Sequence, residues 1–233
     1  MSIPAHPARH GAALIFALCL IIAVSCARLS HAAVMVYDTP AGATLSSKPV
    51  DAVVDFTTSA DTVHIVLRNL QADPKLDTEC LSGLRFHLSS GQNTGMLTSS
   101  SGIDRSITSG GAYSDASAPV STGWSLLTVG SDLMLDLLST NISPTHTIVG
   151  PPNGSNLYAS GNPSITSGSH NPHIALSATF DLHVTGVTSA STITSAIFQF
   201  DTPSGKNVAG VVPEPASIGL IVVTALGLLQ RRH

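Results

Sequence analysis

Alternation between apolar and polar residues is the feature that most constrains how this chain can fold. Because successive side chains of a β-strand point to opposite faces of the sheet, a two-residue repeat predicts a half-buried strand. Shorter alternating runs predict strands within 52–56, 62–70, 83–89, 124–128 and 196–200, while 133–138 fits either a strand or a short helix. The longest run, His173 to Val184, places on one face Ile174, Leu176, Ala178, Phe180, Leu182 and Val184.

The segments between these runs are polar and contain many turn-forming residues. Residues 89–122 are dominated by Ser, Gly and Thr, and residues 150–172 hold several Pro and Asn-Gly turn signals, so both are predicted to be loops. Short strands, polar turns and no long amphipathic pattern favour an all-β fold, either an antiparallel β-sandwich or a jelly roll. We expect one such domain over residues 33–202.

Composition supports an exported protein and argues against some partners. Charged residues make up 10% of the chain, against about 25% in typical soluble proteins. The polar groups on the surface are therefore expected to be mainly hydroxyls and amides and not charged groups. A net charge of -4 without a basic stripe does not fit a nucleic-acid partner. Cys19 and Cys26 lie near the N-terminus, so Cys80 is left as the single thiol of the body, and no internal disulfide is predicted. Cys80 could pair with another chain or act as a nucleophile, but a buried or idle thiol is the preferred interpretation.

The N-terminus has the order of a secretory signal peptide over residues 1–32. Arg9 and His10 precede an apolar run over 11–24, and a small-residue site follows, with cleavage expected after Ala32 or Ala33. The apolar run is short for a membrane span. Export through the Sec translocon is therefore predicted. An alternative is a lipoprotein box over residues 23–26, in which Cys26 would be acylated.

The C-terminus has three parts in a fixed order over residues 212–233. Val212, Pro213, Glu214 and Pro215 come first, then an apolar run over 216–229, and then Gln230, Arg231, Arg232 and His233. The two prolines hold the backbone extended, as a protease substrate requires. The apolar run predicts a short transmembrane helix that holds the chain transiently, and the arginines favour the cytoplasmic side. Residues 203–211 read as a flexible stalk.

This three-part tail, together with a leader at the other end, resembles the PEP-CTERM sorting signal. The motif of that family is closely matched by the sequence Val212-Pro-Glu-Pro-Ala-Ser-Ile-Gly-Leu. The resemblance covers roughly the last 22 residues (212–233). It implies that the chain is a substrate of exosortase, a membrane-embedded cysteine peptidase that cuts near the motif. It also implies a location in the cell envelope or extracellular matrix of a bacterium, often one that makes exopolysaccharide. The alternative is an ordinary C-terminal anchor that is never cut.

The sequence carries no recognised catalytic signature, so no enzyme and no cofactor is predicted. No Gly-x-Ser-x-Gly elbow, His-Glu-x-x-His motif or phosphate loop occurs. His170, His173 and His183 were weighed as a zinc site, but Pro172 separates the first two and histidines on an exposed polar face explain them more simply. Asp51 and Asp55 lie four apart on a strand and are not expected to form an acid pair.

Two other groups of residues have a functional and a structural interpretation. Asp73, Asp77 and Glu79 form the densest acidic cluster, but the Asp spacing and central Gly of a calcium loop are missing, so a solvated turn is predicted. Sugar binding commonly uses aromatic platforms, and the aromatic candidates are few. Trp124 fits the core better than a platform, which leaves Tyr37, Tyr113 and Tyr158.

Three functions follow in order of preference. The first is a non-catalytic exported surface or matrix protein, sorted by its tail. The second is a binding module for envelope polysaccharide, and the third is a secreted hydrolase of an unfamiliar type.

Overall fold

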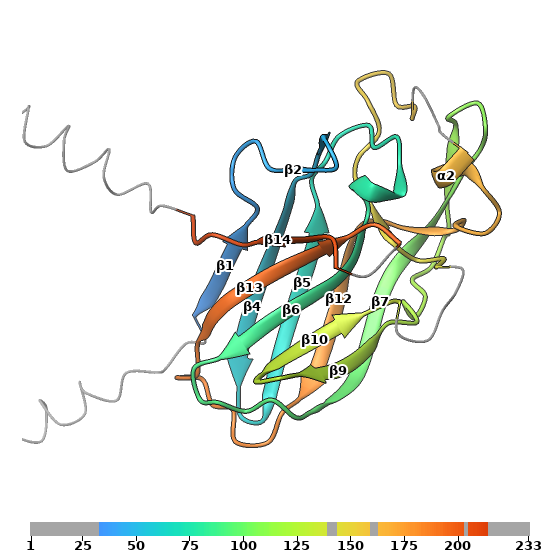
Figure 1. Cartoon of the computed structure of the whole chain (residues 1–233). Helices are drawn as coiled ribbons and strands as arrows, with labels where there is room; N and C mark the ends of the chain where they lie inside the picture. Colours follow the sequence, from blue (N-terminus) through green and yellow to red (C-terminus); the bar gives the residue numbers. More distant parts are fainter. Residues whose placement is uncertain (1–32, 139–143, 159–162, 203–204, 214–233) are drawn as a thin grey trace, which may run out of the picture. The chain divides into compact units, whose positions relative to one another are not determined.

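The computed structural model describes residues 33–138, 144–158, 163–202 and 205–213, and this part of the chain is predominantly β (Figure 1). Helical structure there is limited to a 3-10 turn, η1 (Asp77–Glu79), and one short helix, α2 (Pro163–Thr166). The strands are β1 (Val34–Asp38), β2 (Thr44–Leu45), β3 (Lys48–Pro49), β4 (Ala52–Ser59), β5 (Thr62–Asn69), β6 (Leu81–Leu88), β7 (Met96–Ile107), β8 (Tyr113–Asp115), β9 (Ser125–Val129), β10 (Asp132–Asp136), β11 (Ile148–Val149), β12 (His173–His183), β13 (Ile193–Phe200) and β14 (Asn207–Ala209).

Twelve of these strands form one large mixed sheet, and β2 and β3 form a separate hairpin. One half of the large sheet runs β1-β4-β5-β12-β7-β8, and the other runs β9-β10-β6-β13-β14. The short strand β11 joins the halves, because it pairs with β6 in one and β12 in the other. The β11–β12 pair is parallel, so the prediction of a wholly antiparallel body is wrong at that pair.

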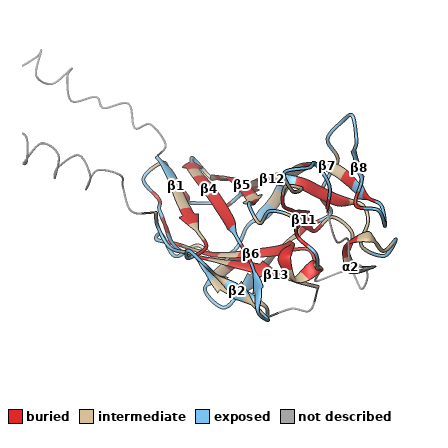
Figure 2. Ribbon diagram, turned by 90° about the horizontal axis from the view of Figure 1, so that it is seen from above, coloured by how far each residue is buried: buried red, intermediate tan, exposed pale blue. Residues whose placement is uncertain are grey.

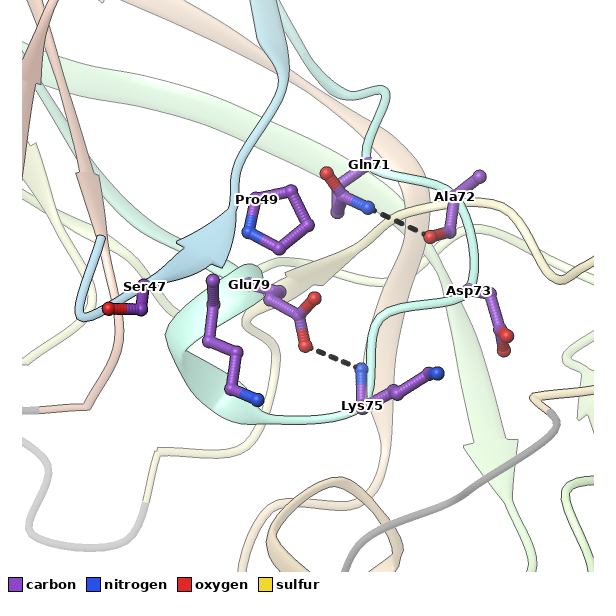
Figure 3. A pocket seen from close by; sticks show the side chains of 8 residues that line it. Ser47, Pro49, Gln71, Ala72, Asp73, Lys75 and Glu79 are labelled. Carbon is purple, nitrogen blue, oxygen red and sulfur yellow. Dashed lines mark hydrogen bonds between the residues drawn. The ribbon is translucent and has the colours of Figure 1, made fainter. Parts of the chain in front are cut away.

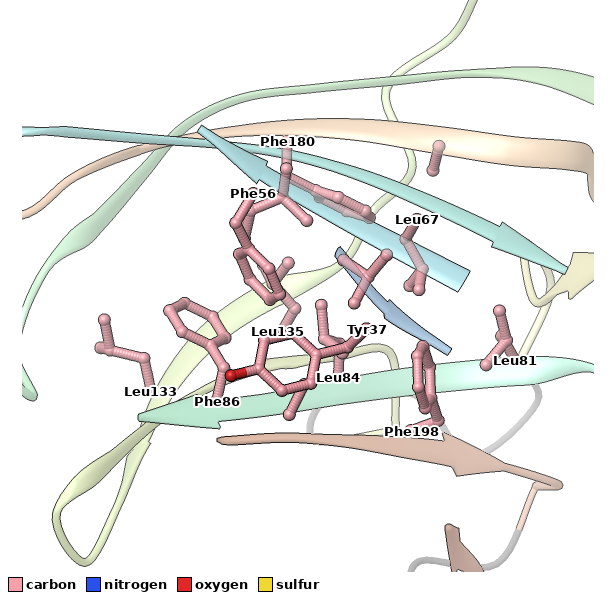
Figure 4. Close-up of a cluster of buried hydrophobic side chains, with 14 of the residues drawn as sticks. Tyr37, Phe56, Leu67, Leu81, Leu84, Phe86, Leu133, Leu135, Phe180 and Phe198 are labelled. Atoms are coloured by element: carbon pink, nitrogen blue, oxygen red, sulfur yellow. The ribbon is translucent and has the colours of Figure 1, made fainter. Parts of the chain in front are cut away.

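The main hydrophobic core lies between the two halves of the sheet (Figure 4). Phe56 on β4 packs against Phe86 on β6 with ring centroids 5.1 Å apart, and Trp124 packs against Phe180 on β12 at 5.2 Å. Each contact joins one half to the other. Trp124 is 4% exposed, which confirms its predicted place in the core. Burying an aromatic or aliphatic side chain of this size contributes roughly 1.5–3 kcal/mol, so this core is the main source of stability.

Strands predicted from alternation are present within 52–56, 62–70, 83–89, 124–128, 173–184 and 196–200, and the ambiguous segment at 133–138 contains a strand, β10. One residue of the longest run was placed on the wrong face. Leu176 has a φ of 63° and is 40% exposed. The register of β12 against β7 shifts between Ile174 and Ala178, which turns Leu176 outward.

The prediction of a loop over 89–122 is wrong, because β7 and β8 lie inside it. β7 is rich in Ser and has few buried apolar residues, so it shows no apolar repeat. Its place is set by β12, with which it pairs from Met96 to Arg105. A strand whose position depends on a partner carries little local signal.

The predicted flexible stalk over 203–211 is wrong in its second half. β14 pairs with Ile197–Gln199 of β13, and Val211 forms an isolated antiparallel bridge with Asp38 at the end of β1. In that bridge the Val211 amide donates to the Asp38 carbonyl at 2.8 Å and the Asp38 amide donates to the Val211 carbonyl at 2.9 Å. The sheet edge therefore extends to Val211.

Within the described ranges no helix is long and apolar enough to cross a membrane. The predicted signal peptide at 1–32 and the predicted span at 216–229 lie outside the described residues.

Candidate functional site

Buried polar groups gather at one end of the sheet, near η1, β11, α2 and the start of β12. We call this region the polar end. It has a small apolar cluster of its own, made of Cys80, Ile107, Val149, Tyr158 and Ile165. Figure 2 shows buried stretches of β7, β11 and β12 at this end, next to α2. Because a buried polar group without a partner is costly, the partners at this end decide what these groups can do.

His173, at the start of β12, is fully buried, so the prediction of exposed histidines is wrong there. Its Nδ1 lies 2.8 Å from the Thr147 hydroxyl and its Nε2 lies 2.9 Å from the Ile165 carbonyl oxygen. Since a carbonyl only accepts, Nε2 carries the proton and Nδ1 accepts from Thr147. Burial lowers the pKa of His173 to about 4, so the ring is neutral at pH 7. Both ring nitrogens are thus occupied by protein groups.

The other two histidines that were weighed as zinc ligands do not join it. His170 Nε2 lies 3.4 Å from Asp77 Oδ2, and His183 is exposed at the far end of β12. Among the described residues, no group of three or more His, Cys, Asp or Glu side chains is arranged to hold a metal ion.

The acidic cluster is not the solvated turn that was predicted, because Asp77 and Glu79 are 5% and 3% exposed. Burial, and then the nearby charge of Asp201, raise the pKa of Asp77 to about 7. Asp77 Oδ1 has no hydrogen-bond partner within the described part of the chain. Cys80 follows directly and is fully buried, as predicted, and burial raises the pKa of its thiol. A buried thiol of this kind is a poor nucleophile.

Arg105 on β7 holds the outer side of the polar end together. It is 4% exposed, and its Nε and Nη2 each donate to a carboxylate oxygen of Asp115 at 2.7 Å. Its Nη1 donates to the Tyr158 hydroxyl at 2.9 Å, and its guanidinium lies over the Tyr113 ring, 4.1 Å from the centroid. Sequence reasoning missed this network because Arg105 fell in a predicted loop.

The tyrosines considered as sugar platforms are used inside the protein. Tyr158 is 1% exposed, donates to the Gly150 carbonyl at 2.8 Å, and has its pKa raised by burial to about 12. Tyr37 is 7% exposed and donates to the Ile193 carbonyl at 2.7 Å. Tyr113 is half-buried beneath Arg105. The rings of Tyr37 and Tyr158 are therefore buried in the protein, and Arg105 covers one face of Tyr113.

A cavity of ≈ 320 Å³ lies beside the polar end, between the β2–β3 hairpin and the 71–79 segment (Figure 3). Glu79 forms part of its wall, and one carboxylate oxygen of Glu79 accepts the backbone amides of Lys75 at 2.7 Å and Leu76 at 2.9 Å. The opposite wall is the hairpin, whose turn residues Ser46 and Ser47 both have positive φ. The cavity is lined by Ser47, Lys48, Pro49, Gln71, Ala72, Asp73, Lys75 and Glu79.

The remaining candidates from the sequence lie elsewhere. Asp55 receives two hydrogen bonds from Arg68 at 2.8 Å, and Asp51 is exposed at the start of β4. In the sorting motif, Val212 is 63% exposed directly after the sheet edge, and Pro213 is the last described residue. Glu214, Pro215, Arg231 and Arg232 lie outside the described residues.

Comparison with known proteins adds nothing to this picture: no protein-family model, no curated protein and no solved structure matches the chain.

Proposed function

We propose that this chain is an exported surface or matrix protein without catalytic activity. It is delivered by a removable leader over 1–32 and sorted by the tail over 212–233. Its partners are then the Sec translocon during export and an exosortase-type peptidase at the membrane, with residues 216–229 inserted only transiently.

One observation carries the proposal: the edges of the folded body match the two expected cutting points. β1 begins at Val34, directly after the expected leader cleavage site. At the other end, the bridge between Asp38 and Val211 closes the sheet edge one residue before the Val212-Pro213 motif. Both cuts would leave every strand of the described residues intact.

We infer further that the two halves of the mixed sheet form a two-layered sandwich. The aromatic contacts across the core, Phe56 with Phe86 and Trp124 with Phe180, support this arrangement. A sandwich of this kind suits display at a surface, because its loops and outer faces stay accessible while the core provides stability.

The intact mass of the protein recovered from the surface of its native host tests the proposal. We expect a mass that corresponds to a start at Ala33 or Val34 and an end near Pro213. Additional mass on that new C-terminus would extend the proposal to covalent transfer onto an envelope component. A chain that still ends at His233 would overturn sorting by cleavage and leave a membrane-anchored β-domain.

A further inference from the structure

The chain has only three lysines, and the fold brings all three to one place. Lys48 and Lys75 both line the cavity described above. Lys206, which lies just before β14, donates from Nζ to the Ser46 hydroxyl at 2.8 Å, at the tip of the same β2–β3 hairpin. These residues are far apart in the sequence. Their convergence is therefore a product of the fold and not of local composition.

The arginines of the described residues behave differently. Arg68, Arg85 and Arg105 each form an ion pair with an aspartate. Neither Lys48 nor Lys75 forms an ion pair within the described part of the chain, and both are exposed. The two side chains therefore leave positive charge available at the rim of the cavity, where ammonium groups attract anionic oxygens.

The rest of the lining provides hydrogen-bond acceptors and neutral polar groups. Glu79 lies against the cavity with one oxygen held by two backbone amides, and Asp73 is also part of the lining. Gln71 and Ser47 add an amide and a hydroxyl. Carboxylates accept from hydroxyl donors, so this wall favours a ligand with several O–H groups. The lining contains two lysines, which attract an anion, and two carboxylates, which repel it. A bare anion without hydroxyl groups is therefore not favoured.

We propose that this cavity binds an acidic saccharide unit, a hydroxyl-rich ring that carries a carboxylate. The charges of Lys48 and Lys75 at the rim attract the ligand carboxylate, and the ring hydroxyls donate to Glu79. A volume of ≈ 320 Å³ is at the lower end of the range for small-molecule sites, which suits one sugar ring of a longer chain. No aromatic side chain lines the cavity, so recognition is polar, and affinity falls with rising salt. The inference concerns the cavity alone and does not depend on whether the tail is cut.

Calorimetric titration of the full-length chain in mild detergent tests this binding site. The probes are a trisaccharide of galacturonic acid, the matching neutral galactose trisaccharide and inorganic phosphate. We expect the uronate to bind at least roughly tenfold more tightly than either of the others, because only it satisfies both the lysines and the acceptor wall. Replacing both lysines, K48Q with K75Q, should weaken uronate binding by roughly tenfold or more.

The control variant is R85Q, which removes one positive charge from a side chain that does not line the cavity, and it should leave uronate binding unchanged. Because Lys48 and Lys75 are exposed, their replacement should not unfold the protein, and urea unfolding checks this. Equal binding of the neutral sugar would overturn the role of charge. Phosphate binding as tight as the uronate would replace the saccharide by a simple anion. Full uronate binding by the double lysine variant would place the ligand elsewhere.

Discussion

The main core and the polar end belong to the same sheet but are stabilised by different kinds of interaction. In the main core, apolar side chains from both halves meet across aromatic contacts. At the polar end, a cluster of only five buried side chains lies near buried Arg105, Asp77 and His173. Burial of apolar area is non-directional, whereas buried charges and hydrogen bonds depend on particular partners. The first region should respond to volume, and the second to partner loss and pH.

The largest effect is expected in the main core. Phe56→Ala removes a fully buried ring that contacts Tyr37 and Phe86. We expect the free energy of unfolding to fall by about 3–5 kcal/mol, through lost burial and the cavity left behind. Urea denaturation at neutral pH measures it. Leu157→Ala, at a side chain that is 40% exposed, serves as the control, and a comparable loss there would remove the distinction.

Loss of Arg105 should be the most damaging single change at the polar end. Arg105→Leu leaves the Tyr158 hydroxyl without one partner and Asp115 without its paired charge. We expect a loss of about 3 kcal/mol in urea denaturation, as for other buried pairs broken on one side. Arg105→Lys should recover less than half of it, because an ammonium cannot replace the planar fork.

The control is Arg68→Leu, which breaks an Arg–Asp pair in which one guanidinium nitrogen donates to both carboxylate oxygens, and whose side chains are 35% and 27% exposed. Its cost should stay near 0.5 kcal/mol, because water replaces the lost partner. If both arginine variants lose the same amount, burial is not what distinguishes the polar end.

Asp77 should make stability depend on pH. Its pKa is raised in the folded state from 3.8 to about 7. Its stabilising contribution is therefore fully present below pH 3.8 and is lost as the pH rises through about 7. Asp77→Asn cannot ionise, so its stability relative to the natural protein should rise by up to about 4 kcal/mol between pH 4 and pH 8. Urea denaturation at several pH values measures this difference.

His173 provides the opposite slope at the same end. Its pKa is lowered from 6.5 to about 4, so its contribution is present above pH 6.5 and is lost as the pH falls through about 4. The stability of His173→Gln relative to the natural protein should therefore rise as the pH falls over that range. If the free energy of unfolding of each variant differs from that of the natural protein by a constant amount at every pH, neither Asp77 nor His173 changes its pKa on unfolding.

The smallest effect is expected on the outer face of the sheet, away from both regions. His64 Nδ1 lies 2.6 Å from Asp181 Oδ1, with the side chains 45% and 44% exposed. The hydrogen bond from His64, and then that from Ser99, lower the pKa of Asp181. His64→Ala should cost about 0.5 kcal/mol or less.

The pKa of Asp181 in the His64→Ala variant should rise toward its ordinary value, which NMR titration of the carboxyl group detects. Because that pKa is depressed in the folded protein, its small contribution is present at neutral pH and is lost as the pH falls through it. An unchanged Asp181 pKa would show that the pair does not form in solution.

Alternation of residue types was enough to predict the strands that have one buried and one exposed face. This holds for β4, β5, β6, β13 and most of β12. Each of them has one buried and one less buried face, so apolar and polar residues alternate in its sequence. The sequence also placed Trp124 in the core and buried Cys80, both of which the structure confirms. Export and sorting are predicted from the residues at the two ends of the chain.

The contacts between residues far apart in the chain become visible only in the folded protein. β7 and β14 are strands because β12 and β13 pair with them, and Leu176 turns outward because the register shifts there. His173 is buried because Thr147 and Ile165 supply its partners. The three lysines, far apart in the sequence, likewise converge on one hairpin. Such features depend on contacts between segments far apart in the chain, so a local pattern of residue types cannot predict them.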